Sequence, residues 1–477
     1  MPANTTQFTE QQSRPMTVNL VTIHGATNTR RNFLSPIISP LTSDVDAPTT
    51  LGEVMATLQA VTSKLERLEI FHPDPHIMIS NVEPTTDPSA APTDVSIGIK
   101  VKELGRLKLQ TGTDIGNSEG SAYGSLLWRN IFGGAEMLSL HASAGTRTRS
   151  AYSTTLSVPV LSNPDMRLAL DALGSSTDKP WASHEEVVKG GNLRMSWLNK
   201  ESDLNAVEYS GAWRQVTGLS GNASSSVRAE AGDSVKSSVK HIFERDRRDN
   251  RHLPQSGYKV KSILELAGLG PLGGDVAFAK GEVDLGGAVP LGIDGPSGVS
   301  IGAGLKLGML YPLPLGFDGS GKAKPSRIAD RFLLGGPNDV RGFKLGGLGP
   351  HDGHDSVGGD VYAAGGINML FPVPYKGADS PLRFQVFVNG GRLVALKNKG
   401  KDRHAAAEGM DTRTVRDGMV RAFREITGGP PSMAAGLGLV YAHPMARFEL
   451  NFSLPLAMAR GEQSTKGLQF GVGINFM

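Results

Sequence analysis

The feature that most constrains this chain is the alternation of apolar and polar residues in segments of about ten residues. From Val299 to Met309, the odd positions carry Val, Ile, Ala, Leu, Leu and Met, and the even positions carry Ser, Gly or Lys. The same period of two recurs over residues 382–389, 447–454 and 468–476, with one exception at Phe387. A period of two is that of a β-strand with one apolar face, and about ten residues is the length with which a tilted strand crosses a bilayer.

A water-soluble β-sandwich is the alternative to a membrane barrel, because its strands alternate for the same geometric reason. About sixteen segments follow the pattern, and they begin near residues 106, 119, 135, 150, 166, 190, 204, 235, 257, 275, 298, 357, 382, 433, 445 and 467. Connections after even-numbered segments are mostly short, whereas the three longest, 173–190, 311–356 and 396–431, follow odd-numbered ones. Short turns at one end and long loops at the other are typical of membrane barrels.

A sheet that spans hydrocarbon has to close on itself. Each backbone N–H or C=O left unpaired there costs several kcal/mol, so the two edge strands must find partners. We therefore predict a mainly β fold whose larger part, residues 104–477, is a transmembrane antiparallel β-barrel of 16 strands.

The segment before the barrel has a different pattern. Strand-like runs at 17–23, 77–82 and 95–101 accompany two helical stretches, 30–38 and 51–70, in the order strand, helix, helix, strand, strand (βααββ). We predict a small α+β domain over residues 16–103, after a disordered N-terminus at 1–15. Its exposed sheet edges would allow peptide binding by strand addition, and a simple spacer is the alternative.

Composition argues against several classes of function. Lys and Arg total 49 against 46 Asp and Glu, a net charge of +3 that is too balanced to indicate nucleic acid as the partner. The chain has no cysteine, which excludes a disulfide framework, a thiolate metal site and a cysteine nucleophile. No stretch approaches the roughly 18 apolar residues of a membrane-spanning helix, and residues 1–15 lack the pattern of a secretory signal or a transit peptide.

Three further patterns have competing explanations. The cluster of His351, Asp352, His354 and Asp355 could ligate a metal, but its loop position favours a solvated polar tip. The basic run 245–251 could contact anionic lipid headgroups or form surface salt bridges. Residues 412–426 predict an amphipathic helix that covers the barrel mouth, docks a partner or packs on its own loop, with an apolar face made of Val415, Met419, Phe423 and Ile426.

Residues 331–374 carry the most specific motifs. They include RFLLGGP at 331–337, GP at 349–350, GGDVY at 358–362, LFPVP at 370–374, and the tetrapeptide Val340, Arg341, Gly342 and Phe343. This segment resembles the bacterial surface antigen (BamA-like) family of outer-membrane assembly barrels, and specifically the mitochondrial sorting and assembly machinery (SAM) core barrel. The resemblance extends over residues 107–149, which match the family's first strands, and the front segment resembles one polypeptide-transport-associated (POTRA) domain.

The resemblance implies a function in protein transport without covalent chemistry, cofactor or metal. The chain would insert β-barrel precursors into the mitochondrial outer membrane through a lateral gate between its first and last strands. The gate residues are then Leu107, Leu109, Thr111, Gly112, Thr113 and Ile115 in the first strand, and Gln469, Gly471, Gly473, Ile474 and Phe476 in the last. The last strand also fits the signal form of the family's clients, and glycines would weaken both strands.

The same resemblance implies partners and a location. The partners are β-barrel precursors, membrane lipids, peripheral SAM subunits on the cytosolic face and inner-membrane organising and translocase complexes, with no nucleic acid. The POTRA domain would lie in the intermembrane space. A passive porin, a polypeptide-translocating pore of the same superfamily and a structural scaffold are the alternatives; the long loop with Arg341 argues against a porin.

Arg341 lies, by the resemblance, on a loop inside the polar lumen and needs a partner, because an unpaired buried charge is costly. In bacterial relatives carboxylates on nearby strands meet this arginine, and the matching positions here are Asn368 and Asn389. We therefore predict neutral hydrogen bonds, or Asp360, in place of a direct ion pair with those strands.

Overall fold

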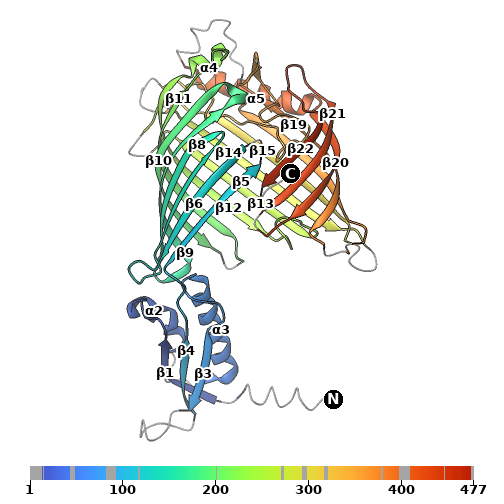
Figure 1. Ribbon diagram of the computed structural model, residues 1–477. Helices are drawn as coiled ribbons and strands as arrows, with labels where there is room; N and C mark the ends of the chain where they lie inside the picture. Colours follow the sequence, from blue (N-terminus) through green and yellow to red (C-terminus); the bar gives the residue numbers. More distant parts are fainter. Residues whose placement is uncertain are drawn as a thin grey trace.

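The computed structural model describes residues 13, 15–42, 49–81, 93–116, 119–199, 201–269, 273–292, 298–315, 321–375, 377, 380–396, 409–444 and 446–473. The chain forms a large β-barrel with a smaller unit, the front unit, at one end (Figure 1). Most of the predicted disordered N-terminus, together with Ile474 and Phe476, lies outside the described residues.

The front unit is a four-stranded sheet with two helices. In chain order it comprises β1 (Pro15–His24), α2 (Arg31–Ile38), the 3-10 turn η1 (Ser39–Leu41), β2 (Thr49–Thr50), α3 (Leu51–Arg67), β3 (His76–Asn81) and β4 (Asp94–Lys100). The strand order is β2-β1-β4-β3, with β1 and β4 parallel. This confirms the predicted order of elements and adds β2, a strand of two residues that is too short to leave a periodic signal.

Periodicity and capping explain α3. Thr50 accepts from the amide of Glu53 while the Glu53 carboxylate accepts from the amide of Thr50, a reciprocal cap that fixes where the helix starts. The apolar face of α3 is buried against the sheet, where it contributes Val54, Leu58, Val61 and Leu65 to a core shared with Ile97 and Ile99.

Sixteen antiparallel strands form the barrel, as predicted. They are β5 (Leu107–Gly116), β6 (Glu119–Arg129), β7 (Met137–Gly145), β8 (Thr148–Val160), β9 (Asn163–Lys179), β10 (His184–Leu198), β11 (Leu204–Thr217), β12 (Gly232–Asp246), β13 (Gly257–Ala267), β14 (Phe278–Pro290), β15 (Ser300–Pro312), β18 (Val361–Pro372), β19 (Leu382–Val394), β20 (Ser432–Ala442), β21 (Arg447–Ala457) and β22 (Gly467–Gly473). Each strand pairs with its neighbour in the chain, from β5 to β22.

The alternating residues face opposite sides of the barrel wall. On β21, Phe448, Leu450, Phe452 and Leu454 point outward, and the last three are 44–48% exposed, whereas Arg447, Glu449, Asn451 and Ser453 point inward and are at most 5% exposed. Large apolar side chains are similarly exposed on the outside of most other strands. A continuous apolar exterior around a polar interior is the pattern of a barrel in lipid and excludes a β-sandwich, whose apolar faces would be buried.

One predicted connection is wrong. Residues 173–190 are not a long loop, because β9 continues to Lys179 and β10 starts at His184. Only the turn with η2 (Pro180–Ala182) separates the two strands. Their ends carry polar residues that hide the period of two, because strands that extend beyond the lipid need no apolar face.

Three other connections carry structure of their own. Residues 313–360, the lumen loop, include a short hairpin of β16 (His351–Asp352) and β17 (Asp355–Ser356). The connection from β19 to β20 holds α5 (Thr412–Gly428), and the connection from β11 to β12 holds α4 (Ser225–Ala229). Among the helices of the described ranges, none combines the length and apolar character that crossing a membrane requires.

Helix α5 packs against the ends of strands β18 and β19 of its own barrel, and not only on the loop that carries it. Met419 and Ala422 are buried with Val361 and Val394, and Ile426 packs against the same cluster. Phe423, which we predicted on the apolar face, is 45% exposed. The buried face of the helix instead consists of Val415, Gly418, Met419 and Ala422.

The turn between β6 and β7 joins the front unit to the barrel. The Arg30 amide donates to the carbonyl of Gly133, its guanidinium pairs with Glu136 at 2.9 Å, and Asn130 donates to the Thr29 hydroxyl at 2.9 Å. Ala135 and Met137 of the barrel are buried in the core of the front unit. The two units therefore share an apolar core as well as polar contacts.

Candidate functional site

The predicted tetrapeptide lies inside the barrel, on the lumen loop. Val340 and Phe343 are fully buried in an apolar cluster with Leu348 and Ala434. Gly342 has φ +87°, and a Cβ there would lie 2.6 Å from the Cβ of Ala434 on β20. Only glycine combines this backbone conformation with so close an approach to the wall.

Arg341 pairs with a carboxylate that we did not predict, so neutral hydrogen bonds or Asp360 as the partners of its guanidinium were wrong. Its Nε lies 2.9 Å from Oε2 of Glu449, and its Nη2 lies 3.1 Å from Oε1, a two-point contact between loop and β21. The guanidinium also lies over the ring of Phe387, 4.9 Å from its centre. This contact explains why Phe387 breaks the alternation: it faces the lumen because it packs under Arg341.

Of the three predicted partners, Asn389 contacts the backbone of Arg341, and Asp360 and Asn368 lie elsewhere. The side-chain amide of Asn389, oriented so that both of its polar atoms are satisfied, accepts from the Arg341 backbone amide at 2.8 Å. Asp360 accepts from the Ser326 hydroxyl and, at 2.8 Å, from the amide of Leu396. It therefore links the lumen loop to the segment that follows β19. Asn368 lies on β18, where it borders a small cavity with Arg447.

Glu449 was missed, although the pattern could have indicated it. The alternation over 447–454 places Arg447, Glu449 and Asn451 on the inward face of β21. Arg447 pairs with Glu449 at 2.5 Å, and Asn451 donates to Glu449 at 2.7 Å. Gln385 of β19 donates to Glu449 and accepts from Arg447. One buried carboxylate thus connects two arginines from different segments.

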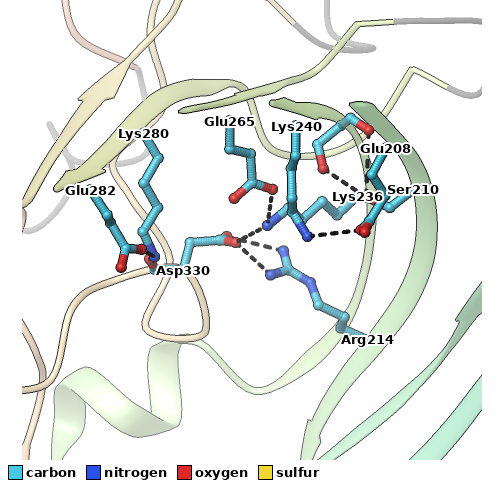
Figure 2. Close-up of polar contacts among 10 residues, drawn as sticks. Glu208, Ser210, Arg214, Lys236, Lys240, Glu265, Lys280, Glu282 and Asp330 are labelled. Carbon is cyan, nitrogen blue, oxygen red and sulfur yellow. Dashed lines mark hydrogen bonds and ion pairs between the residues drawn. The ribbon is translucent and has the colours of Figure 1, made fainter. Parts of the chain in front are cut away.

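The lumen loop has a second anchor on the opposite wall, which the sequence did not indicate. Figure 2 shows Asp330 among cations from three strands. It accepts from Arg214 of β11 at 2.6 and 3.0 Å and from Lys236 of β12 at 3.2 Å, and Lys280 of β14 donates to its backbone carbonyl at 3.0 Å. Lys236 also pairs with Glu265 at 2.7 Å.

The loop therefore crosses the lumen between two buried ion pairs. Asp330 holds it to strands β11 and β12, and Arg341 holds it to β21. Both pairs are almost fully shielded from solvent, with side-chain exposures of 7% or less for Arg214, Asp330, Arg341 and Glu449. Breaking such a pair leaves an uncompensated charge, so the loop position is strongly specified.

The predicted gate residues lie at the two edges of the barrel sheet. Within the described part of the chain, no ladder joins β5 to β22, although every other pair of neighbours is hydrogen-bonded. Leu107 and Leu109 are 65% and 72% exposed, and Thr111 and Thr113 are also exposed. On β22, Gly471 is buried and Gly473 half-buried. We call the line between β5 and β22 the seam.

The lumen loop contacts the last strand directly, which brings two predicted sets of residues together. The amide of Gly342 donates to the side-chain oxygen of Gln469 at 2.8 Å, and the Gln469 amide donates to the carbonyl of Phe343 at 3.2 Å. Asn338 donates to the backbone carbonyl of Val472 at 3.1 Å. The loop thus holds one side of the seam by hydrogen bonds.

Gly112 on β5 has a packing reason for being glycine. A Cβ there would lie 2.7–2.9 Å from the ring and hydroxyl of Tyr123 on the paired strand β6. On the other side of the seam, Leu468 and Phe470 point outward and are 70% and 46% exposed.

Sequence comparison decides the family. A model of the Omp85 superfamily domain matches residues 130–476, most of the chain and nearly all of the barrel. The chain belongs to the Omp85 superfamily. It is 35% identical to a SAM50-like protein of Schizosaccharomyces pombe, over 98% of this chain and 92% of the relative. It is 33% and 32% identical to the sorting and assembly machinery component 50 homologs of Bos taurus and Homo sapiens, over 91% of this chain and 86% of each. The family predicted from residues 331–374 is confirmed.

Solved structures of Omp85-like fold agree. BamA from Haemophilus ducreyi lacking POTRA domains 1-3 aligns with a TM-score of 0.72 at 15% identity, over 96% of this chain and 85% of that one. CdiB from Acinetobacter baumannii aligns with a TM-score of 0.53 at 12% identity, over 97% and 74%. At these identities the likeness is one of fold.

Two carboxylates of the His351 to Asp355 cluster contact the start of helix α4. Asp352 accepts from the Ser226 amide at 3.1 Å and hydroxyl at 2.7 Å, and Asp355 accepts from the Ser224 amide at 2.7 Å. Both carboxylates thus satisfy donors at the start of α4. Asp355 is only 3% exposed, whereas His354 at the tip is exposed, so the predicted solvated tip holds for His354 and is wrong for Asp355. Across the described ranges, no group of three or more potential metal-ligating side chains occurs.

Proposed function

We propose that this protein inserts β-barrel precursors into the mitochondrial outer membrane through the seam between β5 and β22. Relatives that carry the name of a sorting and assembly machinery component align over almost the entire chain, which supports the role and the location. The observation that carries the gate is the contrast within one sheet: fifteen neighbouring pairs of strands are hydrogen-bonded, and the described parts of the two edge strands are not.

Strand addition follows from this geometry. An edge strand presents unpaired N–H and C=O groups, and a client strand in hydrocarbon needs partners for its own. Pairing of a client's last strand with β5 satisfies both at once. Further hairpins can add while every backbone group stays paired, so no covalent step and no cofactor are needed.

The lumen loop has a positioning role in this proposal. It holds Gln469 of β22 and Glu449 of β21 from inside the barrel. We infer that these contacts keep the last two strands in place while β5 exchanges partners. Movement is then confined to one side of the seam.

The front unit is a POTRA domain in this proposal, and it faces the intermembrane space. It is fixed to the β6–β7 turn, at the barrel end with the shorter connections. Peripheral subunits of the machinery would then bind the opposite, cytosolic end with the long loops, and inner-membrane complexes would meet the front unit.

Crosslinking to an incoming client tests the proposal. The chain has no cysteine, so single cysteines at Leu107 or Leu109, two exposed outward positions of β5, give a signal without background. A precursor with one cysteine in its final strand should crosslink there during insertion. A cysteine at Leu170 on β9, which is 58% exposed, is the matched control and should not react.

Two outcomes would contradict the gate. One is equal crosslinking at β5 and β9; the other is efficient insertion with no crosslink to β5. A pore that passes polypeptide through the lumen would instead give crosslinks to inward residues such as Lys236.

A further inference from the structure

The turn between β12 and β13 is much longer than its position requires. Residues 247–256 connect two adjacent antiparallel strands, a task that Leu161 and Ser162 accomplish alone between β8 and β9 at the same barrel end. We call residues 247–256 the β12–β13 insert. A connection so much longer than a hairpin requires indicates that the segment has a second role besides reversing the chain.

The insert is folded rather than extended into solvent. Asp249 accepts from the amides of Gln255 and Ser256 at 3.0 and 3.1 Å, and Asn250 accepts from the amides of His252 and Leu253 at 2.8 and 3.2 Å. Arg248 pairs with Asp246 of β12 at 2.8 Å. These bonds confirm the salt-bridged alternative for the basic run and give the insert a defined shape.

The insert crosses the inside of the barrel. Leu253 is 5% exposed and packs on Leu370 of β18 and Val440 of β20, and Arg447 of β21 donates to the carbonyl of His252 at 3.2 Å. In the ring of sixteen, β12 is the eighth strand and β21 the fifteenth, so they lie on nearly opposite walls. Such a contact is possible only through the lumen.

The insert borders a small cavity at the inner wall of the barrel. Arg248, Arg251 and Pro254 border a cavity of about 60 Å³ against the inner wall of β14, β15 and β18. That volume holds a few water molecules and excludes a polypeptide.

We propose that the β12–β13 insert is a plug that closes the lumen at the end near the front unit. The insert also contacts β21, from the barrel end opposite to the one from which the lumen loop enters. Arg447 donates to the insert and pairs with Glu449, and Glu449 pairs with Arg341 of the lumen loop. The insert and the lumen loop enter the barrel from opposite ends. They are thus connected through Arg447 and Glu449, two residues of β21. Closure of the lumen to ions is a separate property from client insertion.

Ion conductance tests the plug without any client. The full chain in planar bilayers is compared with a variant in which Arg248–Gly257 is replaced by Asn-Gly, a pair that closes a two-residue hairpin. We expect the replacement to raise conductance several-fold, and Leu253→Asp to raise it by a smaller factor. Leu161→Asp, at a position that is 88% exposed at the same end, should leave it unchanged. Wild-type conductance in the correctly folded replacement variant would overturn the proposal.

A labelling experiment covers the case in which the replacement fails to fold. Leu253→Cys should resist a membrane-impermeant maleimide in proteoliposomes, whereas Leu161→Cys should react within minutes. Equal reaction rates at the two positions would show that the insert lies outside the lumen and would overturn the plug. Neither measurement depends on the proposed insertion activity.

Discussion

The wall formed by β9 to β12 and the seam between β5 and β22 are built differently. Strands β9, β10, β11 and β12 have 17, 15, 14 and 15 residues, and β10 pairs with β11 without irregularity from Glu185 to Leu198. At the seam, β5 has ten residues and the described part of β22 has seven, with no ladder between them. Strands of the wall have backbone ladders on both edges, whereas β22 has a ladder only with β21 and is held in addition by hydrogen bonds to the lumen loop.

This difference shows how one barrel can be both stable and able to open. A ladder of many backbone bonds opens cooperatively and rarely. The described part of the seam has no ladder between β5 and β22, so β5 can exchange partners there without unfolding the rest of the sheet.

Hydrogen exchange gives the largest expected contrast. We expect amides of β22 to exchange on the order of a thousandfold faster than those of β10 and β11, because local opening at the seam requires little unfolding. Exchange followed by mass spectrometry in detergent measures both in one sample. Equal protection of the two regions would contradict the comparison.

The anchor of the lumen loop near the seam should be expensive to break. Arg341→Ala leaves Glu449 buried with only part of its charge compensated, and we expect a loss of about 3–5 kcal/mol in the free energy of unfolding. Urea unfolding in detergent micelles measures it. Lys344→Ala, at an exposed position on the same loop, is the control and should change little. A loss in Arg341→Ala no larger than that in Lys344→Ala would show that the pair with Glu449 does not specify the loop position.

A change at Asp330 tests whether the two anchors of the lumen loop are independent. Asp330→Asn should cost about 3 kcal/mol, because Arg214 loses its partner, although Lys236 keeps Glu265. Unlike Arg341→Ala, this change should leave exchange at β22 nearly unaltered, since the contacts of Gln469 remain. Faster exchange at β22 in Asp330→Asn would show that the two anchors act as one.

Gly342→Ala should cost about 2 kcal/mol, because alanine is strained at φ +87° and its Cβ meets Ala434. Gly353 also has a positive φ, +65°, but nothing lies near its missing Cβ, so Gly353→Ala isolates the backbone strain. Thermal unfolding followed by circular dichroism compares the two. Adding Ala434→Gly to Gly342→Ala should recover the share of the lost stability that comes from the contact between the two Cβ atoms. If Gly342→Ala and Gly353→Ala lose equal stability, the contact with Ala434 contributes nothing.

The junction of the front unit should respond to acid with the smallest effect. Burial would raise the pKa of Glu136, but the amides of Gly134 and Phe132 and the charge of Arg30 outweigh it, so the pKa lies below its ordinary value of 4.5. A lowered pKa means that the contact stabilises the junction fully above pH 4.5 and loses this effect as the pH falls further. Fluorescence energy transfer between labels on the two units should therefore stay constant from pH 8 to 5 and change below 4.5. Glu136→Gln should remove the pH dependence.

Several features of the fold follow from residues alone. The period of two fixes which side chains face lipid, because each strand of the barrel lies between two different solvents, and this local pattern predicts all sixteen strands. The turn-rich segment 331–374 indicates the family and the loop that carries Arg341. Even Glu449 could have been predicted as an inward residue of β21.

Other features depend on distances across the lumen, which no local pattern encodes. The pairing of Arg341 with Glu449, the second anchor at Asp330 and the burial of Leu253 join residues 108 to 195 positions apart. Which inward side chains meet depends on how strand tilt and stagger close the ring. The sequence by itself determined the strands and their faces through the solvent that each face contacts. Only the closed barrel decided which polar groups pair inside it, because buried charges take whatever partner the geometry brings within reach.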